Sequence, residues 1–125
     1  MHDDYPEYHR RLQKVYARLA RNLRGPMTAF AQLSAAATAE GVLDARTKQL
    51  IALGIGITVR CDGCIAYHVH DALRAGASKE EILETIGVAI FMGGGPAVIY
   101  GCEALEALEQ FEARQPTPPP PSSMV

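Results

Sequence analysis

Apolar residues recur every three or four positions along most of this chain, which is the spacing of one face of an α-helix. Glycine and proline separate the segments that carry this spacing, and no segment has a convincing strand pattern. The expected helices cover about residues 5–23, 27–39, 45–60, 62–75, 79–93 and 96–111. The first two could form one helix or two. The chain is therefore predicted to be an all-α bundle of five to six helices.

Capping patterns predict where several of these helices begin and end. Asp44 is a candidate N-cap for the third helix, and Ser78 with Glu81 forms the capping box that opens the fifth. Gly76 suits the position that follows the end of the fourth helix. The Gly25–Pro26 pair is expected to end the first helix.

Length and composition indicate one soluble domain followed by a tail. The chain has 125 residues, which is enough for a hydrophobic core, and we place the helical domain at residues 1–114. Residues 115–125 hold five of the eight prolines and are expected to be disordered. The net charge of -2 argues against nucleic-acid binding. Aromatic residues make up only 6% and Trp is absent, so the core must consist mainly of aliphatic residues and alanine.

The same patterns carry expectations about location and assembly. The longest apolar run, residues 50–59, is shorter than the roughly 20 residues of a membrane span. No signal peptide is visible, and three cysteines are an odd number for a secreted disulfide framework, which together predict a cytoplasmic protein. Residues 44–60 and 82–100 carry more apolar surface than a small bundle hides. We therefore expect a homo-oligomer, a hexamer or alternatively a trimer.

The main chemical signal is the Cys61-Asp62-Gly63-Cys64 motif, with His68 one helical turn further on. The motif lies where one apolar helix ends and the next begins. If Asp62 caps the new helix, Cys64 lies in its first turn, where free amides and the positive helix end stabilise a thiolate. His68 shares a helix face with Cys64, which allows a thiol–imidazole hydrogen bond. Cysteines three positions apart can also close a disulfide.

Two other interpretations of this motif stay open. A structural zinc site would use Cys61, Cys64 and His68, with His70 or Cys102 as a fourth ligand, although a second Cys-x-x-Cys pair is missing. Alternatively, the two cysteines are an inert buried pair.

The remaining polar residues are expected to have no chemical role. Cys102 lies in an apolar stretch and is expected in the core, whereas His2 and His9 are expected in solvent. An exposed helix face is expected to carry Glu103, Glu106, Glu109 and Glu112.

Several segments between Asp44 and about Phe111 match a known family in unbroken register. These segments are Lys48-Gln49-Leu50-Ile51-Ala52-Leu53, Cys61-x-x-Cys64-x-x-x-His68, Ala75-Gly76-Ala77-Ser78, Glu80-Glu81-Ile82 and Met92-Gly93-Gly94-Gly95-Pro96. On these residues the chain resembles the carboxymuconolactone decarboxylase superfamily, in its alkylhydroperoxidase D-like (AhpD-like) branch. The resemblance implies an all-helical, oligomer-forming domain that needs no metal or other cofactor.

The resemblance also implies a thiol-dependent peroxidase. Cys64 would attack the hydroperoxide and become a sulfenic acid, and Cys61 would resolve it as a disulfide. A dithiol reductant would regenerate the pair, and His68 would relay a proton from the second cysteine.

The chain departs from the family pattern in its proton relay. The family glutamate, twelve residues before the first cysteine, is replaced by Gln49, which cannot act as a base. Glu84 or Glu80, on the neighbouring helix, are candidates to supply the missing carboxylate. Two alternative functions stay open: a lactone decarboxylase, which needs no cysteine pair, and a non-enzymatic oligomer that senses redox state or binds metal.

Overall fold

A computed structural model describes the fold of residues 2–114, and within this range the chain contains six α-helices and no strand. The helices are α1 (Tyr5–Asn22), α2 (Arg24–Thr38), α3 (Ala45–Thr58), α4 (Asp62–Arg74), α5 (Lys79–Gly93) and α6 (Gly95–Arg114). The all-α prediction is confirmed, with α1 and α2 as separate helices. The predicted disordered tail, residues 115–125, lies outside the described residues. None of the six helices is long and apolar enough to cross a membrane.

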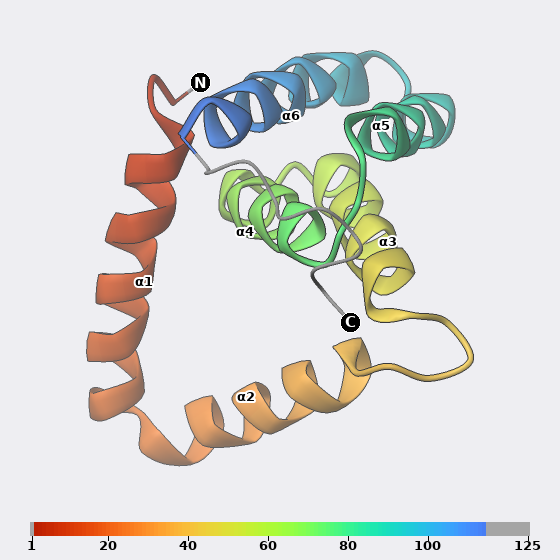
Figure 1. Cartoon of the computed structure of the whole chain (residues 1–125). Coiled ribbons are helices and arrows are strands. Elements are labelled where there is room, and N and C mark those ends of the chain that lie inside the picture. The colour runs from red at the N-terminus through yellow and green to blue at the C-terminus, as the bar shows by residue number, and fades with distance from the viewer. Residues whose placement is uncertain (1, 115–125) are drawn as a thin grey trace.

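Helices α3 to α6 pack around a core of aliphatic side chains and alanines (Figure 1). Helices α3 and α6 each contact the other three helices of this bundle. The largest fully buried side chains of this bundle are Leu53, Ile57, Ile65, Val69, Ile82 and Leu108. Burying one side chain of this size stabilises the fold by about 1.5–3 kcal/mol relative to leaving it in water. Seven alanines fill the spaces between them, as the low aromatic content predicts.

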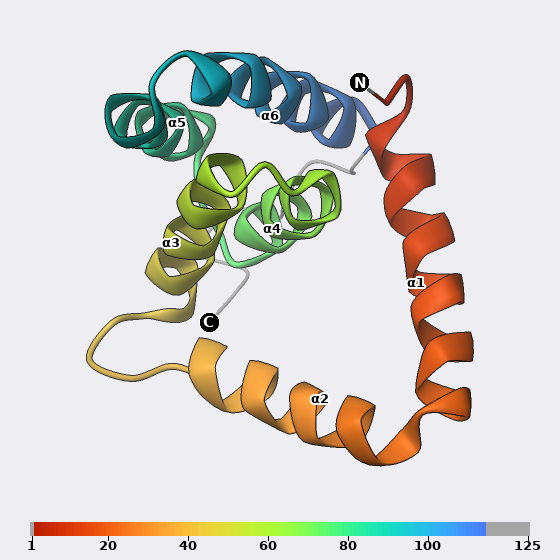
Figure 2. The same cartoon turned by 180° about the vertical axis from the view of Figure 1, so that it is seen from behind.

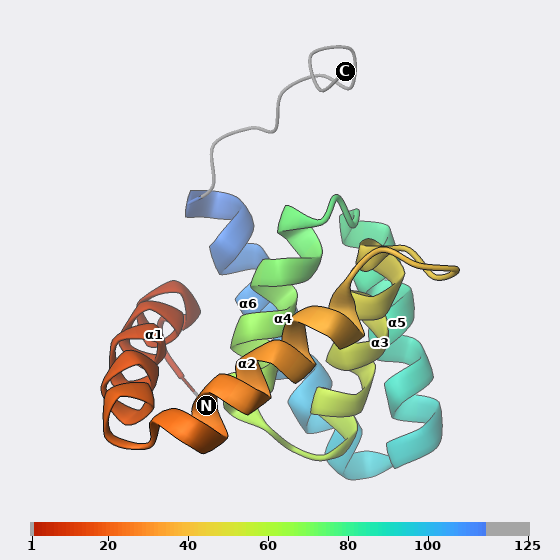
Figure 3. The ribbon, with the colours of Figure 1, turned by 90° about the horizontal axis from the view of Figure 1, so that it is seen from below.

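Helices α1 and α2 form an arm that leaves the bundle and returns to it. The start of α1 lies against α4 and α6, and α2 then runs back toward the start of α3 (Figures 1 and 2). Seen from below, α2 crosses in front of the bundle (Figure 3). It contains no buried residue, and its Phe30 and Leu33 side chains are 57% and 63% exposed. The arm is therefore attached mainly through the first turns of α1.

That attachment corrects the expectation for Glu103. Glu103 is only 5% exposed, and its carboxylate accepts a hydrogen bond of 2.8 Å from the buried Tyr5 hydroxyl. Burial, together with the neighbouring Glu103, raises the pKa of Tyr5 far above its usual value. The Gln110 side chain also accepts a hydrogen bond of 2.7 Å from the Tyr5 amide. A residue predicted on an exposed face thus holds α1 against α6.

Most of the predicted helix boundaries are confirmed. Asp44 caps α3 by accepting from the Thr47 amide at 2.7 Å, and the Ser78 capping box opens α5. Gly76 follows α4 with φ of 95°, which glycine tolerates at no steric cost. The prediction for Gly25–Pro26 is wrong: the break is at Leu23, and this pair lies in the first turn of α2. Proline is tolerated there because the first helical amides have no partner within the helix.

Candidate active site

The turn between α3 and α4 brings the two cysteines to the start of a helix. After α3 ends, Arg60 adopts a left-handed conformation with φ of 62°, and the Cys61 amide donates to the Gly56 carbonyl at 3.0 Å. A non-glycine residue in this conformation costs about 1–2 kcal/mol. The reversed chain packs α4 back against α3, so the fold holds the Cys61–Cys64 motif in this strained turn.

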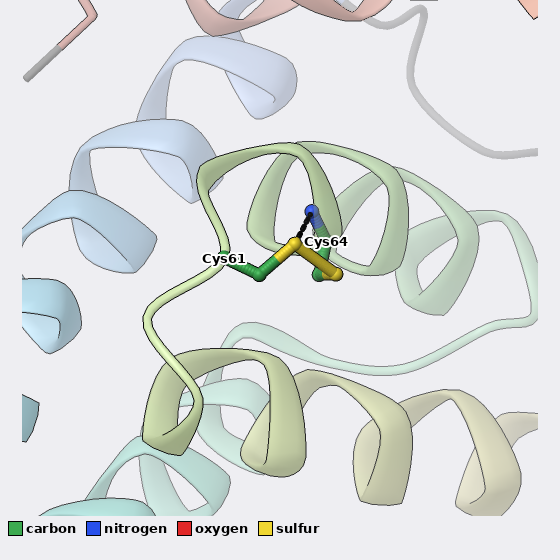
Figure 4. Close-up of a disulfide and its surroundings, with 2 residues drawn as sticks. All are labelled: Cys61 and Cys64. Carbon is green, nitrogen blue, oxygen red and sulfur yellow. Dashed lines mark hydrogen bonds between the residues drawn. A yellow bond between two sulfur atoms is a disulfide. The ribbon is translucent and has the colours of Figure 1, made fainter.

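Cys61 and Cys64 are joined by a disulfide, with 5.1 Å between their Cα atoms (Figure 4). Cys61 is the N-cap of α4, and its Sγ accepts a hydrogen bond of 3.1 Å from the Cys64 amide. The predicted cap, Asp62, instead occupies the first turn and pairs with the His2 ring at 3.2 Å. The expected disulfide therefore forms, but a sulfur atom rather than a carboxylate caps the helix.

His68 lies one turn after Cys64 and pairs with Gln49 across the α3–α4 contact. The His68 Nδ1 atom is 2.9 Å from the Gln49 side-chain oxygen. With that oxygen as acceptor, the proton of neutral His68 is on Nδ1, and Nε2 is free to take another proton. Burial lowers the pKa of His68 below its usual 6.5, and Asp71 opposes this shift to a smaller extent. The neutral ring is thus the form that the site favours at pH 7.

One glycine lets α3 approach the cysteine pair closely, and a second glycine lies beside α1. A Cβ added at Gly56 of α3 would lie 2.9 Å from the Cys64 Cβ, a distance that real Cβ atoms essentially never show. A Cβ at Gly63 would lie 3.4 Å from Leu12 and 3.7 Å from the Tyr8 hydroxyl, both on α1. The cysteine motif is therefore enclosed between α3 and α1. The apolar, glycine-containing pattern of α3 indicated close helix contacts, but no pattern in the sequence indicated the contribution of α1.

The sequence itself matches a family model over these elements. Residues 26–107 match the model of the carboxymuconolactone decarboxylase family. The chain belongs to this family. The match covers more than half of the chain, from the first turn of α2 into α6, and includes the whole candidate site.

Relatives of this family member share both its sequence and its fold. A carboxymuconolactone decarboxylase family protein of Legionella pneumophila, solved in its apo form, is 39% identical, with a TM-score of 0.82 over 86% of this chain and 96% of that one. A family protein of Thermotoga maritima is 31% identical, with a TM-score of 0.73 over 87% and 90% of the two chains. Its description raises the possibility of involvement in an antioxidative response. Protein 4 of the cox locus of Paracoccus denitrificans is 43% identical over 67% of this chain and 76% of its own length.

In this family member, the glutamates considered for the relay are not brought to His68. Glu80 and Glu84 are exposed on α5, which packs against α3 and α6, whereas His68 belongs to α4. The hydrogen-bond partner of His68 is Gln49, at the position where the resemblance described above implies a glutamate. The partner of the His68 ring is therefore the Gln49 amide and not a carboxylate.

The side chains of the zinc alternative are also separated. His70 Nδ1 is 2.8 Å from an Asp71 carboxylate oxygen, and its ring stacks on His9. Cys102 is exposed on α6, so its predicted place in the core is wrong. Within residues 2–114, no three His, Cys, Asp or Glu side chains lie where they could hold one ion.

Proposed function

We propose that this protein is a thiol-dependent peroxidase that reduces hydroperoxides with its Cys61–Cys64 pair and is regenerated by a dithiol reductant. The observation that carries the proposal is the disulfide at the start of α4, one turn from the His68–Gln49 pair. The antioxidative response raised for the Thermotoga maritima relative points in the same direction. A Cys-x-x-Cys disulfide at a helix start is typical of thiol oxidoreductases.

In the proposed cycle, Cys64 is the nucleophile. Its thiolate attacks the terminal oxygen of the hydroperoxide, so an S–O bond forms, the O–O bond breaks, and the leaving alkoxide takes a proton to become an alcohol. The Cys61 thiolate then attacks the Cys64 sulfur, so the S–S bond forms, the S–O bond breaks, and the leaving hydroxide takes a proton to become water. An external dithiol donates two electrons and two protons to reopen the disulfide, and is itself oxidised to a disulfide.

The surroundings of Cys64 support this role. Cys64 lies in the first turn of α4, where backbone amides without helical partners and the helix dipole stabilise negative charge. His68 Nε2 would accept the thiol proton, because Nδ1 is engaged with Gln49. The amide orients the ring without adding the charge that a carboxylate would supply.

The test is hydroperoxide turnover with a dithiol reductant, followed in three serine variants. Cys64→Ser is expected to abolish turnover, because the nucleophile is lost. Cys61→Ser is expected to react once and stop at a sulfenic acid, which a dimedone-type reagent traps. Cys102→Ser is the matched control and is expected to retain wild-type turnover, because this exposed thiol lies outside the pair. Unchanged turnover in Cys64→Ser would overturn the assignment. Lactone turnover that survives loss of both cysteines would favour decarboxylation instead.

A further inference from the structure

A cavity that is open to solvent lies where α1, α4 and α6 meet, away from the cysteine pair. Its volume is about 390 Å³, which is within the range of small-molecule sites. Its polar lining consists of His9, Arg10 and Gln13 from α1, His70 and Arg74 from α4, and Arg114 from α6. None of these residues belongs to the proposed peroxidase site.

His9 is a buried base that faces this cavity without a protein partner. The residue is 6% exposed, its ring stacks on His70 with 4.2 Å between centroids, and its edge meets the Phe111 ring. Within residues 2–114, neither ring nitrogen of His9 has a hydrogen-bond partner, yet no fully buried side-chain nitrogen is left unpartnered. Each nitrogen therefore keeps some contact with solvent, and His9 is one of the residues that line the cavity. The chain supplies no hydrogen-bond partner to either nitrogen, so both are available to a ligand that enters the cavity.

The charged groups of the lining are all cationic. Three guanidinium groups line the cavity, and no carboxylate within residues 2–114 does. Arg10 pairs with Glu7 and Arg114 with Asp4, but Arg74 has no acidic partner in the described part of the chain. Both ion pairs are exposed, and pairs of this kind contribute only about 0–1 kcal/mol, so an incoming anion can compete for the guanidinium groups.

We propose that this cavity binds a small polyanion that carries phosphate or carboxylate groups, held by Arg74 and by a ring nitrogen of His9. Guanidinium groups recognise both kinds of anion with paired hydrogen bonds, and Arg10 and Arg114 stand beside the same space. Such a ligand would contact α1, α4 and α6 together. It would therefore strengthen the attachment of the arm, which otherwise depends on the first turns of α1.

The test is calorimetric titration of the full chain with inorganic phosphate and, separately, with succinate, in chloride buffers of equal ionic strength. Saturable binding of either anion is expected, and the ligand that binds more tightly identifies the class. The ring-proton signals of His9 and His70 should move with the same midpoint. Arg74→Gln should weaken binding by at least about tenfold, because one charge-assisted contact is lost. Arg74 is exposed, so this variant is expected to fold.

Two further variants make the result decisive. Arg18→Gln removes the same charge from an exposed position of α1 outside the cavity, and should leave the affinity within about twofold. Cys64→Ser should bind the anion as the wild type does, since the two sites are separate. Lack of saturable binding for both anions would overturn the proposal. Equal weakening by Arg18→Gln and Arg74→Gln would overturn it too, because that result indicates general charge attraction.

Discussion

The pair of His68 and Gln49 joins the two helices of the candidate site with a neutral hydrogen bond. The 2.9 Å contact orients the imidazole, and burial keeps it neutral. A carboxylate at this position would instead stabilise the protonated ring and raise its pKa. Under the proposed function, the amide limits how strongly His68 can attract the thiol proton.

Replacing this amide by a carboxylate should therefore increase peroxidase activity. Gln49→Glu is expected to raise the rate of hydroperoxide reduction by about tenfold or more, since positioned acid–base groups contribute about 10²–10⁴-fold. The measurement is kcat/KM for hydroperoxide as a function of pH, with the dithiol reductant in excess. Gln49→Ala is the control for the lost hydrogen bond and should be slower than the wild type. A Glu variant no faster than the Ala variant would exclude a relay through this position.

Two histidines should also make stability depend on pH. Burial lowers the pKa of both His68 and His9 below 6.5. Near and below pH 6.5, the unfolded chain therefore binds more protons than the folded chain. Stability is therefore highest above pH 6.5 and falls as the pH decreases from that value toward the lowered pKa. The free energy of unfolding in urea, measured in phosphate-free buffer, should decrease between about pH 7.5 and about pH 5.5. His68→Gln should flatten this slope, and an unchanged slope would contradict the assignment.

At the scale of elements, the site depends on how closely α3 and α4 pack. Gly56 is buried against Cys64, and the next helix begins only a few residues later. Any side chain at this position must push α4 away or move the cysteine. Gly56 has no reactive side chain, yet it helps to set the position of Cys64 in the disulfide.

Gly56→Ala should destabilise the protein although alanine is the better helix former. The added Cβ would lie 2.9 Å from the Cys64 Cβ, and overpacking of this kind costs about 1–3 kcal/mol. Gly87→Ala is the matched control in α5, where nothing lies within 4 Å of the new Cβ. That variant should gain about 0.5–1 kcal/mol. The measurement is the free energy of unfolding of both variants in chemical denaturant. A Gly56→Ala variant as stable as the wild type would show that α4 can shift freely.

The sequence predicted the helices and the site residues that depend on local patterns. The Ser78 capping box and the cysteines at the start of α4 follow from spacing along one helix. Two errors are local, since Gly25–Pro26 lies inside α2 and Cys61 rather than Asp62 caps α4. The other errors concern tertiary contacts. Glu103 and His9 look like surface residues on their own helices, and only the packing of α1 against α6 and α4 buries them. Cys102 has apolar neighbours in sequence, yet its side chain is exposed on α6.

The whole molecule exposes extensive apolar surface. A cavity of about 500 Å³ between α3 and α5 is lined almost entirely by apolar side chains, among them Ile55 and Val88. Phe91 and Met92 of α5 are 84% and 71% exposed. Contiguous apolar surface of this kind usually marks an interface. We therefore still predict a homo-oligomer, a hexamer or alternatively a trimer.

A charge placed on this surface should reduce the assembly. Val88 is 64% exposed, and Val88→Lys is expected to lower the molar mass in light scattering toward that of the 13.5 kDa chain, because lysine is costly to bury in an interface. Glu84→Lys, one turn earlier on the same helix and also exposed, is the control and should keep the wild-type mass. A monomeric wild type at micromolar concentration, or equal effects of both variants, would contradict the prediction.

The short separation of the site residues has a consequence for how the protein matures. Gln49 and His68 are nineteen positions apart, and both cysteines lie between them, so the candidate site is contained in the α3–α4 hairpin. Closing a loop of this length costs less chain entropy than joining more distant segments. The hairpin can thus position its thiols for oxidation while α5 and α6 are still being synthesised. Disulfide closure need not wait for a finished subunit.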